Sequence, residues 1–163
     1  MEPATLRLIE ALHLVPYRYV LSLTGGGTGA VASLLTVPGG SRTVLEVVSP
    51  YGDQALAEHL GYQPEQYCSP ETACAMAERA RARAEWLAPG DEVAGIAGTA
   101  SLATDRPKRG DHRFHLALCT GQRTLLSSLT LVKGARDRAG EEAVLDGVLL
   151  NLMAEAFGVT ART

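Results

Sequence analysis

The chain alternates between short continuous apolar runs, typical of buried strands, and stretches with apolar residues every three or four positions, typical of amphipathic helices. The apolar runs predict strands over residues 19–23, 43–49, 92–97, 113–119 and 124–132. The helical spacing predicts helices over residues 4–14, 30–36, 53–60, 69–86 and 141–157. Helices and strands alternate in the first half, and a hairpin precedes the last helix. The pattern therefore predicts an α/β protein, a single three-layer α/β/α domain with a mixed, mainly parallel sheet.

Length and charge narrow the class of protein. The chain has 163 residues, which suits one domain over residues 1–163, and 15 basic against 18 acidic side chains give a net charge of −3. That balance provides no general attraction to nucleic acid or to an anionic membrane. The longest uncharged run, Tyr19 to Ser41, is too rich in glycine to cross a bilayer, and the start of the chain lacks the basic residues of a signal peptide. We therefore expect a soluble cytoplasmic protein without a nucleic-acid or membrane partner.

The cysteines give no sign of a disulfide framework or a metal site. Cys68, Cys74 and Cys119 form no C-x-x-C pair and no zinc-finger spacing with histidine. We expect them to be small apolar residues in a reducing compartment. Neither an H-E-x-x-H motif nor paired carboxylates at ligand spacing occur, so the sequence predicts no metal and no cofactor.

A glycine-rich turn, Ser22 to Ala30, carries the most information about chemistry. A predicted strand leads into it and a predicted helix follows it. The unpaired backbone N–H groups at such a helix start favour an anion or a developing oxyanion, and glycine lets a ligand approach the backbone closely. Ser22 and Thr24 add hydroxyls at the same place, where one can serve as a nucleophile or as a phosphate contact.

Two other interpretations of this turn stay open. The glycines alone fit a tight strand-to-helix connection without any ligand. Gly25-x-Gly27-x-x-Ala30 also fits a loose dinucleotide-binding pattern, with Glu46 only roughly placed for the ribose contact. The chain is too short to supply the second half of a dinucleotide crevice.

Several motifs follow one another in a fixed order. They are Ser22-x-Thr24-Gly25-Gly26, Val37-Pro38-Gly39-x-Ser41, the segment Glu46–Leu56 and Gly95-Ile96-Ala97-Gly98. In this order they resemble the C-terminal domain of competence/damage-inducible protein A (CinA), over about Val20 to Phe157. The resemblance implies a hydrolase that cleaves an amide or similar bond in a nicotinamide-nucleotide-like phosphorylated small molecule. It also implies a role in pyridine nucleotide metabolism and a homo-oligomer.

The resemblance implies the following roles. Ser22 would be the nucleophile of an amidohydrolase, and Tyr51 would be a second catalytic residue that lines the pocket. In the enzyme hypothesis that we add to this, the amides of Gly25, Gly26 and Gly27 would form an oxyanion hole. The family lysine that assists the serine is replaced here by Leu56, so the chain resembles a divergent member that lacks this lysine.

A charged segment, Asp105 to Arg113, offers other basic residues in place of the missing lysine. It packs four basic residues, two acids and a histidine into nine positions. One interpretation is a solvated loop. The other is a phosphate or carboxylate clamp from Arg106, Lys108, Arg109 or Arg113, with His112 or Lys108 as the substitute base. His13 and His59 lie in ordinary helical patterns, and we assign them no function.

Two classes of function remain. One is the Ser22-centred hydrolase that binds substrate through Thr24, the glycines and the basic loop. The other is a catalytically inactive nucleotide-binding or partner-binding module. A basic nitrogen within about 3.2 Å of the Ser22 hydroxyl would favour the enzyme, whereas a serine that faces only Leu56 would favour the module.

Overall fold

The computed structural model describes residues 1–163 and contains one five-stranded sheet. The strands are β1 (Tyr17–Thr24), β2 (Val44–Val48), β3 (Glu92–Ser101), β4 (His112–Thr120) and β5 (Thr124–Leu131). The helices are α1 (Pro3–Leu12), α2 (Thr28–Thr36), α3 (Asp53–Leu60), α4 (Pro70–Leu87) and α5 (Arg138–Phe157), with a short 3₁₀ turn at Gly40–Arg42. Every predicted strand and helix is therefore present; α3 has the predicted ends, and the others are shifted at one or both ends.

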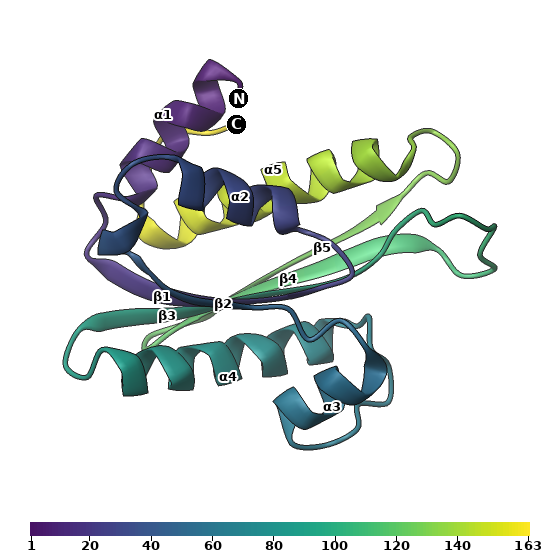
Figure 1. Cartoon of the computed structure of the whole chain (residues 1–163), viewed down its shortest axis with the longest axis horizontal. Helices are drawn as coiled ribbons and strands as arrows, with labels where there is room; N and C mark the ends of the chain where they lie inside the picture. Colours follow the sequence, from purple (N-terminus) through teal and green to yellow (C-terminus); the bar gives the residue numbers. More distant parts are fainter.

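The three-layer arrangement is confirmed. Helices α1, α2 and α5 cover one face of the sheet, and α3 and α4 cover the other (Figure 1). The strand order is β2-β1-β3-β4-β5, in which β1 pairs in parallel with β2 and β3, while β3–β4 and β4–β5 are antiparallel. The sheet is mixed as predicted, but parallel and antiparallel pairs are equal in number because the hairpin β4–β5 extends the sheet directly from β3.

The two faces of the sheet are packed differently. The larger core lies under α1, α2 and α5 and includes Tyr19, Phe114 and Leu149, all fully buried. On the other face, buried alanines of α4 let this helix approach the sheet closely. A Cβ on Gly95 of β3 would lie only 2.0 Å from the carbonyl oxygen of Ala77. The close approach fixes α4, and with it the loop before it, against the centre of the sheet.

Both long helices begin at side-chain caps. The hydroxyl of Ser69 accepts a hydrogen bond from the Thr72 N–H at 3.1 Å, which confirms the predicted start of α4. Helix α5 begins at Arg138 rather than at Glu141. The reason is that Asp137 caps it and accepts a hydrogen bond from the Gly140 N–H at 2.8 Å. The earlier start brings Arg138 onto the helix.

Strand β3 runs to Ser101, four residues beyond its predicted end at Ala97. It is held on both sides, since Thr99 pairs with Thr24 of β1 and Ser101 pairs with Arg113 of β4. Helix α2 links β1 to β2 on one face, and α4 links β2 to β3 on the other (Figure 1). The carboxyl ends of β1 and β3 thus meet where the connections diverge, which is where open α/β sheets bind ligands.

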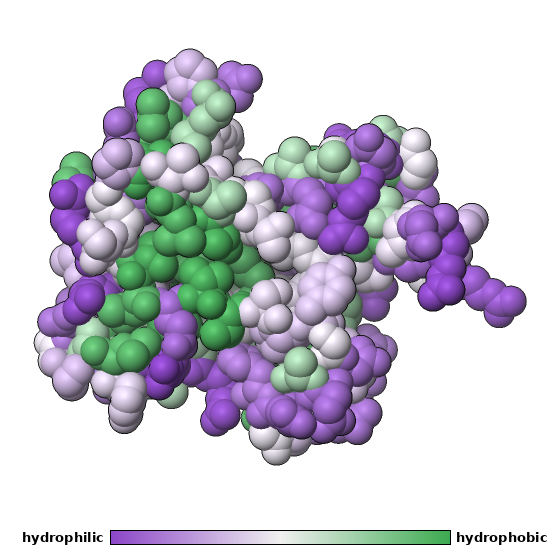
Figure 2. All heavy atoms as spheres, viewed as in Figure 1, coloured by the Kyte–Doolittle hydropathy of each residue, from purple (hydrophilic) through white to green (hydrophobic).

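The edge strand β2 is apolar except for Glu46 and is only half-buried along its whole length. Figure 2 shows apolar side chains gathered over this part of the molecule, between the two helical layers. None of the helices combines the length and the apolar character that a membrane-spanning segment needs.

Candidate functional site

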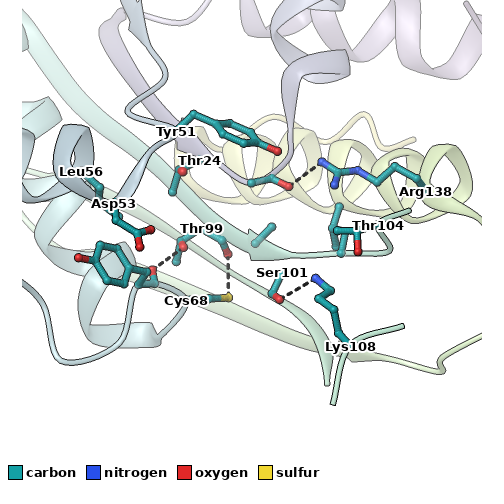
Figure 3. Close-up of a pocket in the computed structure, with 14 residues that line it drawn as sticks. Thr24, Tyr51, Asp53, Leu56, Cys68, Thr99, Ser101, Thr104, Lys108 and Arg138 are labelled. Carbon is teal, nitrogen blue, oxygen red and sulfur yellow. Dashed lines mark hydrogen bonds between the residues drawn. The ribbon is translucent and has the colours of Figure 1, made fainter. Parts of the chain in front are cut away.

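A cleft of about 210 Å³ lies at the carboxyl ends of β1 and β3. Its walls come from the loop before α3, the loop before α4, the segment after β3 and the first turn of α5 (Figure 3). The polar side chains that line it are Thr24, Tyr51, Asp53, Tyr67, Cys68, Thr99, Ser101, Thr104, Lys108 and Arg138. The cleft therefore gathers hydroxyls, a thiol, one carboxylate and two cations in one place.

The glycine turn forms the end of β1 at this cleft. Gly25 has a φ of +80°, and a Cβ on it would lie 2.0 Å from the carbonyl oxygen of Ala100. Only glycine fits both the left-handed backbone and this close approach. The turn is thereby pressed against the last residues of β3.

Carboxylates of α5 occupy the helix start at which the sequence predicted a bound anion. The N–H of Gly27 donates to Oε2 of Glu142 at 2.8 Å, and the N–H of Ala30 donates to Oδ1 of Asp146 at 2.9 Å. The expectation for Gly27 therefore needs correction, because its amide is already paired within the chain. The unpaired N–H groups of α2 attract negative charge as predicted, but the charge comes from the chain itself.

Ser22 does not line the cleft. Its side chain is fully buried, and its Oγ lies 3.0 Å from Nε2 of His59, the penultimate residue of α3. Burial lowers the pKa of His59, the neighbouring Arg79 charge lowers it further, and Glu46 acts in the opposite direction. The imidazole is therefore neutral near pH 7 and suited to share the hydroxyl proton. A basic nitrogen is within the expected reach of Ser22, but it belongs to a histidine that had no assigned function.

The basic segment after β3 sends one side chain into the cleft. Nζ of Lys108 donates a hydrogen bond to Oγ of Ser101 at 2.9 Å (Figure 3). Arg106 and Arg109 are exposed and do not line the cleft. Nδ1 of His112 lies 2.7 Å from the fully buried carboxylate of Glu141, so this histidine is engaged in an internal pair. Of these four predicted residues, only Lys108 reaches the cleft.

Arg138 is a cleft residue that the sequence did not reveal. Its guanidinium donates to the carbonyl oxygen of Gly25 at 2.8 Å and to that of Ala103 at 3.3 Å, and it pairs with Glu142 at 2.7 Å. The hydroxyl of Tyr51 points toward it across the cleft mouth (Figure 3). The i, i+4 spacing of Arg138 and Glu142 is a recognisable helix pair, but nothing local indicates the contact with Gly25.

Leu56, which the resemblance places at the family's lysine position, does line the cleft. It is buried against Leu60, Met76 and Ala77. The wall opposite Lys108 is therefore apolar at this position (Figure 3). No group of three or more His, Cys, Asp or Glu side chains lies close enough to hold a metal ion.

Comparisons with known proteins bear on the fold. No protein-family model and no curated protein sequence matches the chain. Among solved structures, competence/damage inducible protein CihA from Agrobacterium tumefaciens superposes with a TM-score of 0.75 at 15% identity, over 95% of this chain and 96% of that one. This chain has the CinA fold. A CinA superfamily protein from Enterobacter cloacae superposes with a TM-score of 0.73 at 17% identity, over 93% of this chain and 91% of that one.

A third CinA superfamily protein, from Escherichia coli, gives a TM-score of 0.69 at 16% identity, over 95% of this chain and 87% of that one. The likeness in all three cases extends over nearly the whole chain. The motifs that resemble the CinA family thus lie within a CinA fold, and the expected resemblance is confirmed at the level of architecture. A shared fold does not by itself fix a reaction, which depends on the residues of the cleft.

Proposed function

We propose that this CinA-fold chain is a hydrolase that cleaves an amide or similar bond in a nicotinamide-nucleotide-like phosphorylated small molecule, bound in the cleft at the carboxyl ends of β1 and β3. The observation that supports this most directly is the meeting of Lys108 with a serine hydroxyl in the same cleft as Arg138. An amine beside a hydroxyl suits nucleophilic attack on a carbonyl carbon, and a guanidinium suits a phosphate.

The size and charge of the cleft favour a small anionic substrate. Its volume of about 210 Å³ is below the roughly 300–1,000 Å³ of sites that enclose drug-sized ligands, which disfavours a dinucleotide. Four of the five N–H donors of Arg138 are engaged by Gly25, Ala103 and Glu142. One N–H and the hydroxyl of Tyr51 beside it remain for a phosphate oxygen while the contact with Gly25 is kept.

In this proposal Ser22 does not have the nucleophile role that the resemblance implies. The resemblance makes it the nucleophile, whereas the structure buries it beneath the cleft against His59. Thr24, two residues further along β1, is the residue of this strand that lines the cleft. The proposed hydrolysis therefore does not depend on contact between Ser22 and the substrate.

The binding module remains the second candidate, because two features favour it. Leu56 stands where the family has its lysine, and the amide of Gly27 is already bonded to Glu142. Such a module would bind the same phosphorylated ligand at Arg138 without cleaving it.

The decisive experiment is to incubate the chain with nicotinamide mononucleotide and to measure ammonia release, with nicotinamide riboside as the matched compound without phosphate. We expect ammonia from the mononucleotide and much less from the riboside. Thermal stabilisation by the mononucleotide without ammonia would support the binding module. The absence of both thermal stabilisation and ammonia release would overturn the proposed substrate class.

A further inference from the structure

We propose that Ser101 is the nucleophile of this cleft and that Lys108 is its general base. The inference deepens the proposed function, on which it rests for its substrate, and it assigns the chemistry to two residues that no family motif marks. Both line the cleft, on the last position of β3 and in the segment that follows it (Figure 3).

The backbone fixes Ser101 at the end of the sheet. Its partner across the β3–β4 ladder is Arg113, and the preceding residue, Ala100, carries the carbonyl against which Gly25 is packed. The side chain is half-buried and opens on the cleft, while its Oγ accepts the hydrogen bond from Nζ of Lys108 at 2.9 Å. This is the distance at which a proton passes between a nucleophile and its base.

A second lysine holds the loop that carries the base. Nζ of Lys133, just beyond β5, donates to the carbonyl oxygens of Lys108 at 2.9 Å and Arg109 at 3.1 Å. The backbone of the loop is thus tied to the segment that follows β5, while the side chain of Lys108 points into the cleft (Figure 3). Lys133 acts as a positioning residue, because it touches the loop and not the cleft.

The surroundings of Lys108 favour its neutral form. Burial lowers the pKa of the amine, and the charge of Arg138 lowers it further. Arg113 acts in the same direction, while Glu141 and Cys68 oppose the shift. A lowered pKa leaves a larger share of neutral amine near pH 7 than an exposed lysine has, and only the neutral amine can accept a proton.

The reaction follows from this geometry. Oγ of Ser101 attacks the carbonyl carbon of the amide, and its proton passes to the neutral Nζ of Lys108. The carbon–nitrogen bond then breaks, the Lys108 ammonium returns that proton to the departing nitrogen, and ammonia leaves. Water attacks the acyl ester, Lys108 accepts a proton from it, and the ester bond to Ser101 breaks. Lys108 finally gives the proton back to Oγ, so the sum is amide plus water to carboxylic acid plus ammonia.

Kinetics with nicotinamide mononucleotide provide the first test. Ser101→Ala should lower the rate of ammonia release by about 10³-fold or more. Lys108→Arg keeps the positive charge but cannot deprotonate, so it should lower the rate by about 10²–10⁴-fold. Ser41→Ala, an exposed substitution at the amino end of the sheet, should leave the rate unchanged. Full activity in Ser101→Ala would overturn the assignment of Ser101 as the nucleophile while leaving the proposed function intact. Full activity in Lys108→Arg would overturn the assignment of Lys108 as the general base and leave it only the role of a positive charge that binds substrate.

A probe that needs no substrate provides the second test. A fluorophosphonate reacts with an activated serine, whose Oγ displaces fluoride while the base takes the proton. The tryptic peptide with Ser101, residues 84–108, contains no other serine, so mass spectrometry locates the adduct. We expect the adduct there, at least tenfold slower labelling in Lys108→Arg, and unchanged labelling in Ser41→Ala. An adduct at Ser22, or none in the unaltered chain, would overturn the inference. Labelling of Ser101 without ammonia release would uphold it and refute the proposed substrate.

Discussion

The hydroxyl oxygen of Ser22 lies 3.0 Å from Nε2 of His59, and this contact joins the middle of β1 to the end of α3. The pair is a hydroxyl beside a base, as a serine hydrolase requires, yet Ser22 has no exposed surface. A substrate carbonyl cannot reach it without displacing α3. The contact therefore stabilises the fold beneath the cleft, where His59 also receives a hydrogen bond at its carbonyl from Arg79.

Ser22→Ala separates a structural role from a catalytic one. The substitution removes one hydrogen bond, so the free energy of unfolding should fall by about 1 kcal/mol, or about 2–4 °C in melting temperature. Ammonia release from nicotinamide mononucleotide should change by less than tenfold. Parallel assays of Ser22→Ala and Ser101→Ala provide the comparison. If the rate of ammonia release fell by 100-fold or more in a folded Ser22→Ala protein, Ser22 and not Ser101 would be the nucleophile.

Arg138→Met tests phosphate recognition. Loss of a charge-assisted hydrogen bond worth about 1.5–3 kcal/mol should raise KM for nicotinamide mononucleotide by about 10–100-fold. The value of kcat/KM for nicotinamide riboside should change far less, because that compound has no phosphate. Arg106→Met is the matched control, since Arg106 is exposed and does not line the cleft. An equal loss with both compounds would show that Arg138 supports only the Gly25 turn.

Gly25→Ala should disrupt the turn that shapes the cleft. A Cβ at Gly25 meets the Ala100 carbonyl oxygen at 2.0 Å, and the φ of +80° is unfavourable for alanine. The left-handed backbone alone costs about 1–2 kcal/mol, so the loss in unfolding free energy should exceed about 2 kcal/mol and activity should disappear. Gly121→Ala, in the β4–β5 turn, has open space around its Cβ and should change stability by less than about 0.5 kcal/mol. Denaturant unfolding of both variants measures the two changes in unfolding free energy. Equal losses in Gly25→Ala and Gly121→Ala would contradict the prediction.

Local signals explain why the fold was largely predictable. Ser69-Pro70 marks the start of α4 because the cap lies within three residues of the group that it satisfies. The cap at Asp137 is equally local, but the predicted helix begins at Glu141, three residues after the observed start at Arg138. The extension of β3 could not be read from composition, since Gly98 to Ser101 has few apolar residues. Its pairing with β1 and β4 holds it in the sheet, and those partners are distant in the sequence.

The candidate site was less predictable because its contacts are not local. The glycine turn was found from its own residues. Its partners Arg138 and Glu142 lie 113 and 115 residues away from the glycines that they bind. His59 likewise meets Ser22 across 37 residues. Lys108 was recognised as a candidate base from the charge of its loop, but only the extension of β3 brings Ser101 within its reach.

Acid pH should weaken the fold through the buried carboxylate of Glu141. Burial alone raises the pKa of this group, but hydrogen bonds from His112 and from the Ala103 N–H, each 2.7 Å long, outweigh it and leave the pKa below its usual value. The unfolded chain therefore binds more protons than the folded one at acid pH. The stabilisation is present above about pH 4.3, the ordinary pKa of glutamate, and is lost as the pH falls through the lower folded value.

Glu141→Gln should remove this pH dependence. The neutral amide keeps the shape of the side chain but weakens both hydrogen bonds, so the free energy of unfolding at pH 7 should fall by about 1–3 kcal/mol. The difference from the unaltered chain should shrink below about pH 4, where Glu141 itself becomes protonated. Glu85→Gln, in an exposed pair with Arg81, is the control and should cost less than about 0.5 kcal/mol. Urea unfolding across pH 3–7 measures both variants, and a Glu141→Gln loss that stayed constant with pH would show that packing, not charge, holds this pair.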